Sequence, residues 1–177
     1  MEEIQIIERV RAGHTEEFGR LVDRYSKMCY SIAFRVSQNM DEAQDIAQDG
    51  LIAAFEHIGS FRLDSKFSTW LYRIVLNKAL ASKKKSNFFE EVENISVKDE
   101  ESEEEFHFQQ ASDIKKALTA LNEKERIIID LYYYQDQSIK EIAAICDISE
   151  ANVKVIMHRA RKKMSETIIS ESVNLSS

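Results

Sequence analysis

Three aspartates have the spacing of a functional cluster. Asp41, Asp45 and Asp49 lie four residues apart with Gln48 beside them, so on a helix they share one face. A metal site or an acid–base cluster is one hypothesis, but no histidine lies in register, and hard cations usually take ligands from loops. A solvated helix face is the simpler interpretation, and a third is that the face docks a basic helix of a partner. We therefore expect this protein to bind neither a metal ion nor a cofactor.

A basic stretch near the C-terminus is the second candidate. Residues 151–163 contain five cations and no acidic residue. The cations are Lys154, Arg159, Arg161, Lys162 and Lys163. Ahead of them, Ser138 and Glu141 form an S-x-x-E capping box, and Ser149 can cap a second helix after a short turn. Two short helices, the second cationic, suit the DNA major groove and its phosphates, whereas the alternative is a solvated basic helix end that complements the helix dipole.

The third candidate is a polar loop at residues 60–70 that carries aromatic residues among cations. Exposed aromatic rings beside cations can hold unstacked bases over a charged backbone. The alternative is that Phe61, Phe67 and Trp70 are core residues that anchor the loop, and this is the preferred interpretation for Phe67 and Trp70. Neither interpretation is preferred for the polar residues, which are Arg62, Lys66, Ser68 and Thr69.

Helices must position these residues. Four glycines and no proline in 177 residues indicate an all-α chain, because a β-rich fold needs more turn residues. Helical periodicity and caps predict the following segments. They are residues 3–11, 15–36, 39–58 and 67–85, then 112–121, 122–134 and the two helices of the basic motif.

The net charge of −7 is distributed unevenly. Residues 1–87 contain 13 basic and 12 acidic residues, residues 88–110 contain one and nine, and residues 111–177 contain ten of each. Like charges repel and residues 88–110 have little to bury, so they are predicted to be an acidic flexible linker between two folded units.

The composition excludes a membrane span and a secreted disulfide scaffold. No apolar run approaches about 20 residues, and the acidic start lacks the basic end of a signal peptide. Cys29 and Cys146 lie far apart among apolar helical positions, so we expect buried reduced thiols and a cytoplasmic protein.

Three segments in this order resemble one family. Residues 41–50 (DEAQDIAQDG) resemble a polymerase-binding segment, residues 67–77 (FSTWLYRIVLN) are similar to a segment that opens and reads the promoter −10 box, and residues 153–163 resemble a helix that reads the −35 box. The family is the bacterial RNA polymerase sigma factors of the sigma-70 family, extracytoplasmic-function (ECF, group IV) class. The resemblance implies two small helical domains, with region two at residues 1–87, a linker at 88–110 and region four at 111–172.

The resemblance also implies partners and site residues. Asp45, Gln48 and Asp49 would dock on the clamp coiled coil of core RNA polymerase, and region four on its flap. Promoter DNA is the second partner and an anti-sigma factor the third. The residues implied for −10 DNA are Phe61, Arg62, Lys66, Ser68, Thr69, Trp70, Arg73 and Asn77. Those implied for −35 DNA are Ser149, Asn152, Lys154, Val155, His158, Arg159, Arg161 and Lys162.

One position departs from the family pattern. Val155 and Ile156 stand where the family commonly has a polar or cationic pair, and hydrocarbon can contact a thymine methyl but cannot hydrogen-bond to guanine. We expect only one of the two to face DNA, because the other lies beside the apolar stripe of the helix. A stand-alone helix-turn-helix regulator with a sensory domain is the alternative function, and a carboxylate-metal hydrolase is a remote one.

Overall fold

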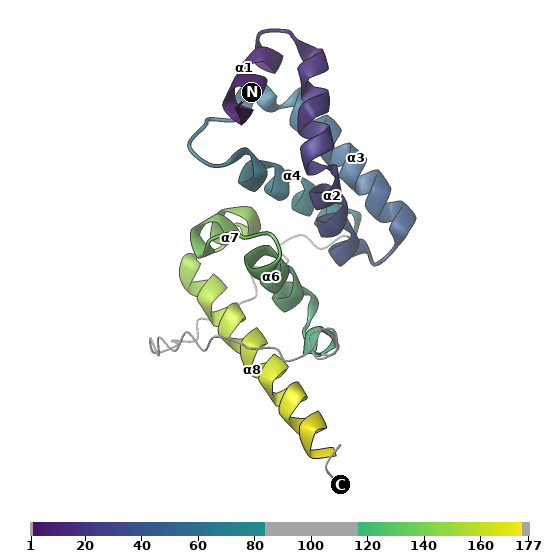
Figure 1. Cartoon of the computed structure of the whole chain (residues 1–177), viewed down its shortest axis with the longest axis vertical. Coiled ribbons are helices and arrows are strands. Elements are labelled where there is room, and N and C mark those ends of the chain that lie inside the picture. Colours follow the sequence, from purple (N-terminus) through teal and green to yellow (C-terminus); the bar gives the residue numbers. More distant parts are fainter. Residues whose placement is uncertain (1, 84–116, 175–177) are drawn as a thin grey trace. The chain divides into compact units, whose positions relative to one another are not determined.

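The computed structural model describes residues 2–83 and 117–174, with side chains as far as residue 169 (Figure 1). Every regular element in these ranges is helical, which confirms the all-α fold. The elements are α1 (Glu3–Arg11), the 3-10 turn η1 (Thr15–Glu17), α2 (Phe18–Ser37), α3 (Met40–Glu56), the 3-10 turn η2 (Ile58–Ser60), α4 (Phe67–Ser82), α6 (Glu123–Tyr133), α7 (Ile139–Cys146) and α8 (Glu150–Asn174). The predicted acidic linker at 88–110 lies outside the described residues.

Local caps start several helices where the sequence predicts them. At Asn39, Asn122, Ser138 and Ser149 a side-chain oxygen accepts the backbone N–H of the residue three positions later, at 2.9 to 3.3 Å. Each bond satisfies a donor that the helix itself leaves without a partner. The predicted third helix ends earlier than expected, at Glu56, because the chain tightens into η2. No described helix has an apolar stretch long enough to cross a membrane.

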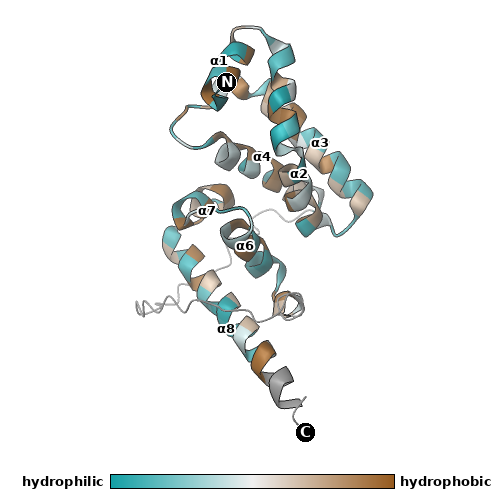
Figure 2. Cartoon of the chain, viewed as in Figure 1, coloured by the Kyte–Doolittle hydropathy of each residue, from teal (hydrophilic) through white to brown (hydrophobic). Residues whose placement is uncertain are grey.

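The first unit is a bundle of α2, α3 and α4, which α1 and η1 complete. Each bundle helix is two-sided: Figure 2 shows both hydrophilic and hydrophobic residues on α2 and α3. The buried stripe of α2 recurs at helical spacing, as the periodicity predicts. Its hydrophobic members are Phe18, Leu21, Cys29, Ile32, Ala33 and Val36.

Gly50 allows α3 and α4 to approach each other closely. A Cβ atom at this residue would lie 2.6 Å from Cγ2 of Val75, whose side chain is completely buried. Carbon atoms pack at about 3.5–4.0 Å, so any side chain at position 50 would push the two helices apart. The absence of a side chain at Gly50 therefore sets the spacing between α3 and α4 at this point.

The second unit is built on the packing of α6 against α8. A hydrophobic cluster joins them, and its buried members are Ala117, Leu121, Ile129, Ala160 and Met164. Beside this cluster, Lys163 Nζ donates to both carboxylate oxygens of the buried Glu125, at 2.7 and 3.0 Å. A buried carboxylate needs such a partner, so this ion pair ties α8 to α6.

Candidate polymerase and nucleic-acid interfaces

The outer side of α3 presents carboxylates to solvent. Ala43, Ile46, Ala47, Gly50, Leu51 and Ala54 are buried on the opposite side. Asp41, Asp45, Gln48 and Asp49 are exposed, and we call these four residues the acidic face. Within the described ranges, no group of three or more His, Cys, Asp or Glu residues could hold a metal ion. The acidic face is thus a charged surface available to a cationic partner.

An apolar groove adjoins the acidic face. It has a volume of about 480 Å³ and lies between the start of α2 and the second half of α3. Its apolar lining comprises Phe18, Val22, Leu51, Ile52 and Phe55, and Gln48 of the acidic face also lines it. Ile52 is 48% exposed, so it adds accessible apolar surface to the groove. The sequence prediction omitted Ile52, although its place four residues after Gln48 puts it on the same side of the helix.

Three aromatic rings anchor the loop between η2 and α4. The ring centre of Phe61 lies 5.5 Å from that of Phe67 and 5.3 Å from that of Trp70. Phe61 and Thr69 are both 4% exposed, and Phe67 is 1% exposed. In this structure both side chains are buried, where aromatic packing and loss of water contact stabilise the loop, and DNA contact by Phe61 and Thr69 stays a prediction. Phe67 is a core residue, as preferred from the sequence.

Polar side chains cover the rest of the loop and one side of α4. In the loop, Arg62 and Lys66 are exposed, and Ser68 in the first turn of α4 is half-buried. On α4, Trp70, Arg73 and Asn77 follow at steps of three and four residues, so they share one side of the helix. Arg73 and Asn77 are exposed, while Trp70 is half-buried. This side offers an aromatic edge, a cation and an amide, which suit stacking, phosphate contact and hydrogen bonding to a base.

The predicted basic helix-turn-helix lies in α7 and α8. Asp147 occupies the turn with a φ of 58°, a left-handed conformation that aspartate tolerates better than most residues. Lys154, His158 and Lys162 recur every four residues along α8 and are all exposed, and we call them the basic row. Of the other predicted residues, Ser149 is exposed, whereas Asn152, Arg159 and Arg161 are half-buried.

Val155 and Ile156 are both buried, at 6% and 4% exposure. Ile156 belongs to the apolar stripe of α8 with Val153, Met157 and Ala160, as helical spacing requires. Neither side chain is presented to solvent in this structure, and the expectation that one of the pair faces DNA stays a prediction. Burying a valine side chain stabilises a fold by about 1.5–3 kcal/mol, so the buried position of Val155 is favoured over an exposed one.

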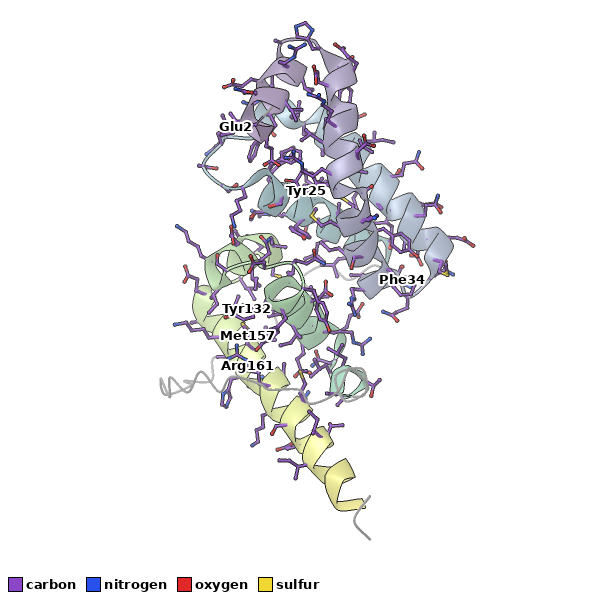
Figure 3. All side chains as sticks on the ribbon, viewed as in Figure 1. Glu2, Tyr25, Phe34, Tyr132, Met157 and Arg161 are labelled. Atoms are coloured by element: carbon purple, nitrogen blue, oxygen red, sulfur yellow. The ribbon has the colours of Figure 1, made fainter. Side chains whose placement is uncertain are left out.

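Arg161 is held by two tyrosines of α6. Its Nε donates to the Tyr133 hydroxyl at 3.1 Å, and its guanidinium carbon lies 5.7 Å from the ring centre of Tyr132 and 5.9 Å from that of Tyr133. Figure 3 labels Tyr132 and Arg161 on their two helices. The cation–π contacts and the hydrogen bond together restrict the rotamers of Arg161, so the two tyrosines fix the direction of its guanidinium group. The tyrosines were not predicted, although three consecutive tyrosines at 132–134 were the available signal.

Both cysteines are free and buried, as expected. Burial raises the pKa of the Cys29 thiol to about 12, and it raises the pKa of Cys146 as well. Both therefore stay protonated near neutral pH and are poor nucleophiles. The pKa of the Tyr25 hydroxyl is also raised, first by burial and then by its hydrogen bond to Glu3.

Comparison with known proteins assigns the family. The family model of sigma-70 region 2 matches residues 21–88, and that of sigma-70 region 4 matches residues 111–164. The chain is 31% identical over 176 residues to the ECF RNA polymerase sigma factor SigW of Bacillus subtilis, and the match covers 92% of this chain and 94% of SigW. The chain belongs to the ECF sigma factors. This sigma factor directs promoter-specific transcription initiation, so the stand-alone regulator is excluded.

Further relatives agree with this assignment. The RNA polymerase sigma-H factor of Pseudomonas aeruginosa is 28% identical over 180 residues, which cover 93% of this sigma factor and 92% of that protein. The solved structure of CnrH with the cytosolic domain of CnrY has a TM-score of 0.67, 24% identity and coverage of 93% and 96%. RpoE of Bartonella quintana, solved with the anti-sigma factor NepR, has a TM-score of 0.64, 24% identity and coverage of 86% and 97%. These two structures establish likeness of fold alone.

Proposed function

We propose that this sigma factor binds core RNA polymerase through the acidic face of α3, captures the −10 element with the η2–α4 loop and α4, and reads the −35 element with α8. Region two at residues 1–87 carries the first two tasks, the segment 88–110 links the domains, and region four at 111–172 carries the third. The protein performs no covalent chemistry of its own and works in the cytoplasm beside the polymerase.

The observation that carries this proposal is the exposed acidic face beside an apolar groove, inside the segment that the region 2 model matches. A helical partner with cations flanking an apolar edge complements both features, because the cations meet Asp45 and Asp49 while the apolar edge covers Ile52. A coiled coil has this construction, which supports the clamp coiled coil of the polymerase as the partner. Region four contacts the flap.

Strand opening falls to the loop and to the exposed side of α4. A base that leaves the duplex loses its stacking, and an aromatic edge such as that of Trp70 replaces it. Arg62, Lys66 and Arg73 supply positive charge for the backbone, and Asn77 can hydrogen-bond to a base edge. Phe61 and Thr69 support this surface from below through their burial.

The −35 element is read by α8. The basic row faces solvent as a line of phosphate contacts, and Ser149 and Asn152 lie at the start of the helix, where backbone N–H groups favour phosphate. Arg159 is the candidate for a base edge, because guanidinium can bind guanine in bidentate fashion. Val155 can contact DNA only if a conformational change exposes its buried side chain.

An anti-sigma factor is the third proposed partner. The Bartonella quintana RpoE structure holds such a factor, and its fold is like this one. A protein that covers the acidic face or the basic row blocks the polymerase or the promoter, so either surface is a site of control.

The test is co-purification with core polymerase after reversing charge on the acidic face. The double variant Asp45→Lys and Asp49→Lys should lose core binding and promoter-specific run-off transcription, with helicity unchanged. Glu8 and Asp23 are exposed acidic residues on α1 and α2, so Glu8→Lys with Asp23→Lys makes the same charge change elsewhere. This control should keep core binding. Equal binding by the two double variants would refute the assignment of the acidic face.

A further inference from the structure

Arg11 joins α1 to the start of the η2–α4 loop. Its Nε donates to the carbonyl oxygen of Ile58 at 3.0 Å, and its Nη2 donates to the carbonyl oxygen of Phe61. These contacts span 47 and 50 residues of sequence. We propose that Arg11 is a positioning residue for promoter opening, which holds the loop of residues 61–66 in the conformation that receives an unstacked base. The inference rests on the proposed function of that loop.

The two carbonyl groups are the points from which the loop departs. Ile58 opens η2, and Phe61 follows it as the cap residue, with φ −67° and ψ 119°. Within the turn, the Ile58 carbonyl also accepts the backbone N–H of Phe61 at 3.3 Å, and carbonyl groups at a helical terminus carry partial negative charge. The guanidinium of Arg11 adds charge-assisted hydrogen bonds to both carbonyl groups from one rigid planar group. Arg11 thus fixes the backbone just before Arg62.

α1 is a firm support for this contact. Ile6, Ile7 and Val10 bury its inner side. At its start, Glu3 accepts hydrogen bonds from the Tyr25 hydroxyl and from Arg24. Near its end, Arg9 adds a partly exposed ion pair to Glu17 at 3.1 Å, and ion pairs of this kind contribute little to stability. The position of α1 is therefore set by its buried side and by its contacts with α2, and Arg11 transmits that position to the loop.

The far end of the loop is anchored by the burial of Phe67, whose ring also packs against Phe61. Phe67 begins α4 and is 1% exposed, so the segment between Phe61 and Phe67 is tied at both ends. Between them Leu63 has a φ of 61°, a conformation that non-glycine residues adopt rarely. Order at both ends reduces the entropy that the loop loses when a base binds. Without Arg11, the start of the loop at Phe61 loses both hydrogen bonds from the guanidinium. The loop then has more conformational entropy to lose when it binds a base, which slows promoter opening.

The role lies outside the segment that the region 2 model matches, since α1 precedes residue 21. Polymerase binding does not require the contact between Arg11 and the loop, because the acidic face is on α3. The buried side of α3 packs against α2 and α4 within the bundle. The inference therefore separates two steps: Arg11 acts on opening and leaves assembly of the holoenzyme intact.

The experiment compares Arg11→Ala with Arg9→Ala in the reconstituted holoenzyme. Both variants remove an exposed arginine from α1, but only Arg11 contacts the loop. Open-complex formation on a duplex promoter is followed by permanganate reactivity of unpaired thymines, and run-off transcription compares this promoter with the same promoter carrying a pre-melted −10 bubble. Arg11→Ala should slow opening of the duplex about tenfold, as expected for losing hydrogen bonds from a charged donor, with less effect on the bubble. Arg9→Ala should behave as wild type on both templates.

Three results would overturn the inference. They are equal opening rates for Arg11→Ala and Arg9→Ala, equal loss on duplex and bubble, and loss of core binding by Arg11→Ala, which would make Arg11 a support of the fold. Arg11→Lys keeps the charge with fewer donors, so its opening rate should fall between wild type and Arg11→Ala. Arg62→Ala combined with Lys66→Ala, measured beside them, tests the loop assignment itself, because both are exposed loop residues: if this double variant opens the duplex normally, the proposed function of the loop fails, whatever Arg11 does.

Discussion

Substitution of Gly50 by alanine should destabilise region two, although alanine favours helices. The new Cβ would lie 2.6 Å from Cγ2 of Val75, about 1 Å inside the usual carbon contact distance. Val75 is completely buried and β-branched, so it has one strongly preferred rotamer in a helix and cannot swing aside. The helices must separate instead.

The expected magnitude follows from two opposing effects. Overpacking a well-filled core costs about 1–3 kcal/mol, and the contact at Gly50 is short enough to place this site at the upper end. Replacing glycine by alanine inside a helix returns about 1 kcal/mol. The free energy of unfolding should therefore fall by about 2 kcal/mol, which lowers the urea midpoint by about 1 M.

Trp70 makes the measurement selective. It is the one tryptophan in the chain and lies on α4, so its fluorescence follows unfolding of region two in the full-length protein. Gly19→Ala is the matched control, because a Cβ there meets nothing within 4 Å, and its midpoint should stay level or rise. Adding Val75→Ala to Gly50→Ala should cost less than the sum of the single changes. A Gly50→Ala midpoint at or above wild type would refute this account of α3–α4 packing.

Three further predictions concern function and reactivity. Asn77→Ala combined with Ser68→Ala should impair opening of duplex promoters but not of pre-melted ones, as run-off transcription measures; equal loss on both would indicate a folding defect. Lys154→Ala should weaken all promoters alike and reduce the salt slope of binding by roughly one, whereas Arg159→Ala should relax one −35 position by about 1–3 kcal/mol. The same shift of preference in both variants would contradict this division. The pKa of Cys29, raised to about 12, predicts slow alkylation at pH 8 in the native protein and fast alkylation in urea, and stability that declines as pH rises above 9.0, where the unfolded thiol ionises. Mass spectrometry of the alkylated peptide measures the first, and native alkylation at the unfolded rate would contradict it.

The helices were predictable because their causes are local. Caps such as Asn39 and Ser149 act on an N–H three residues away, and the stripes of α2 and α8 repeat within a few turns. The acidic face follows from the same periodicity, so its members could be named from spacing alone. Phe61 could not be placed in this way, since its loop has no periodicity and its partners Phe67 and Trp70 meet it only through the fold.

The sequence by itself determined the helical class, most helix starts, the charged surfaces and, through three ordered motifs, the family. Tertiary structure alone decided which candidate side chains are covered, as for Thr69 and Val155, and which residues distant in sequence meet. Arg11 meets Ile58 across 47 residues, and Gly50 meets Val75 across a helix interface. The reason is that periodicity reports only which side of a helix is apolar. What that side packs against, and how closely, depends on contacts that exist only after the chain has folded.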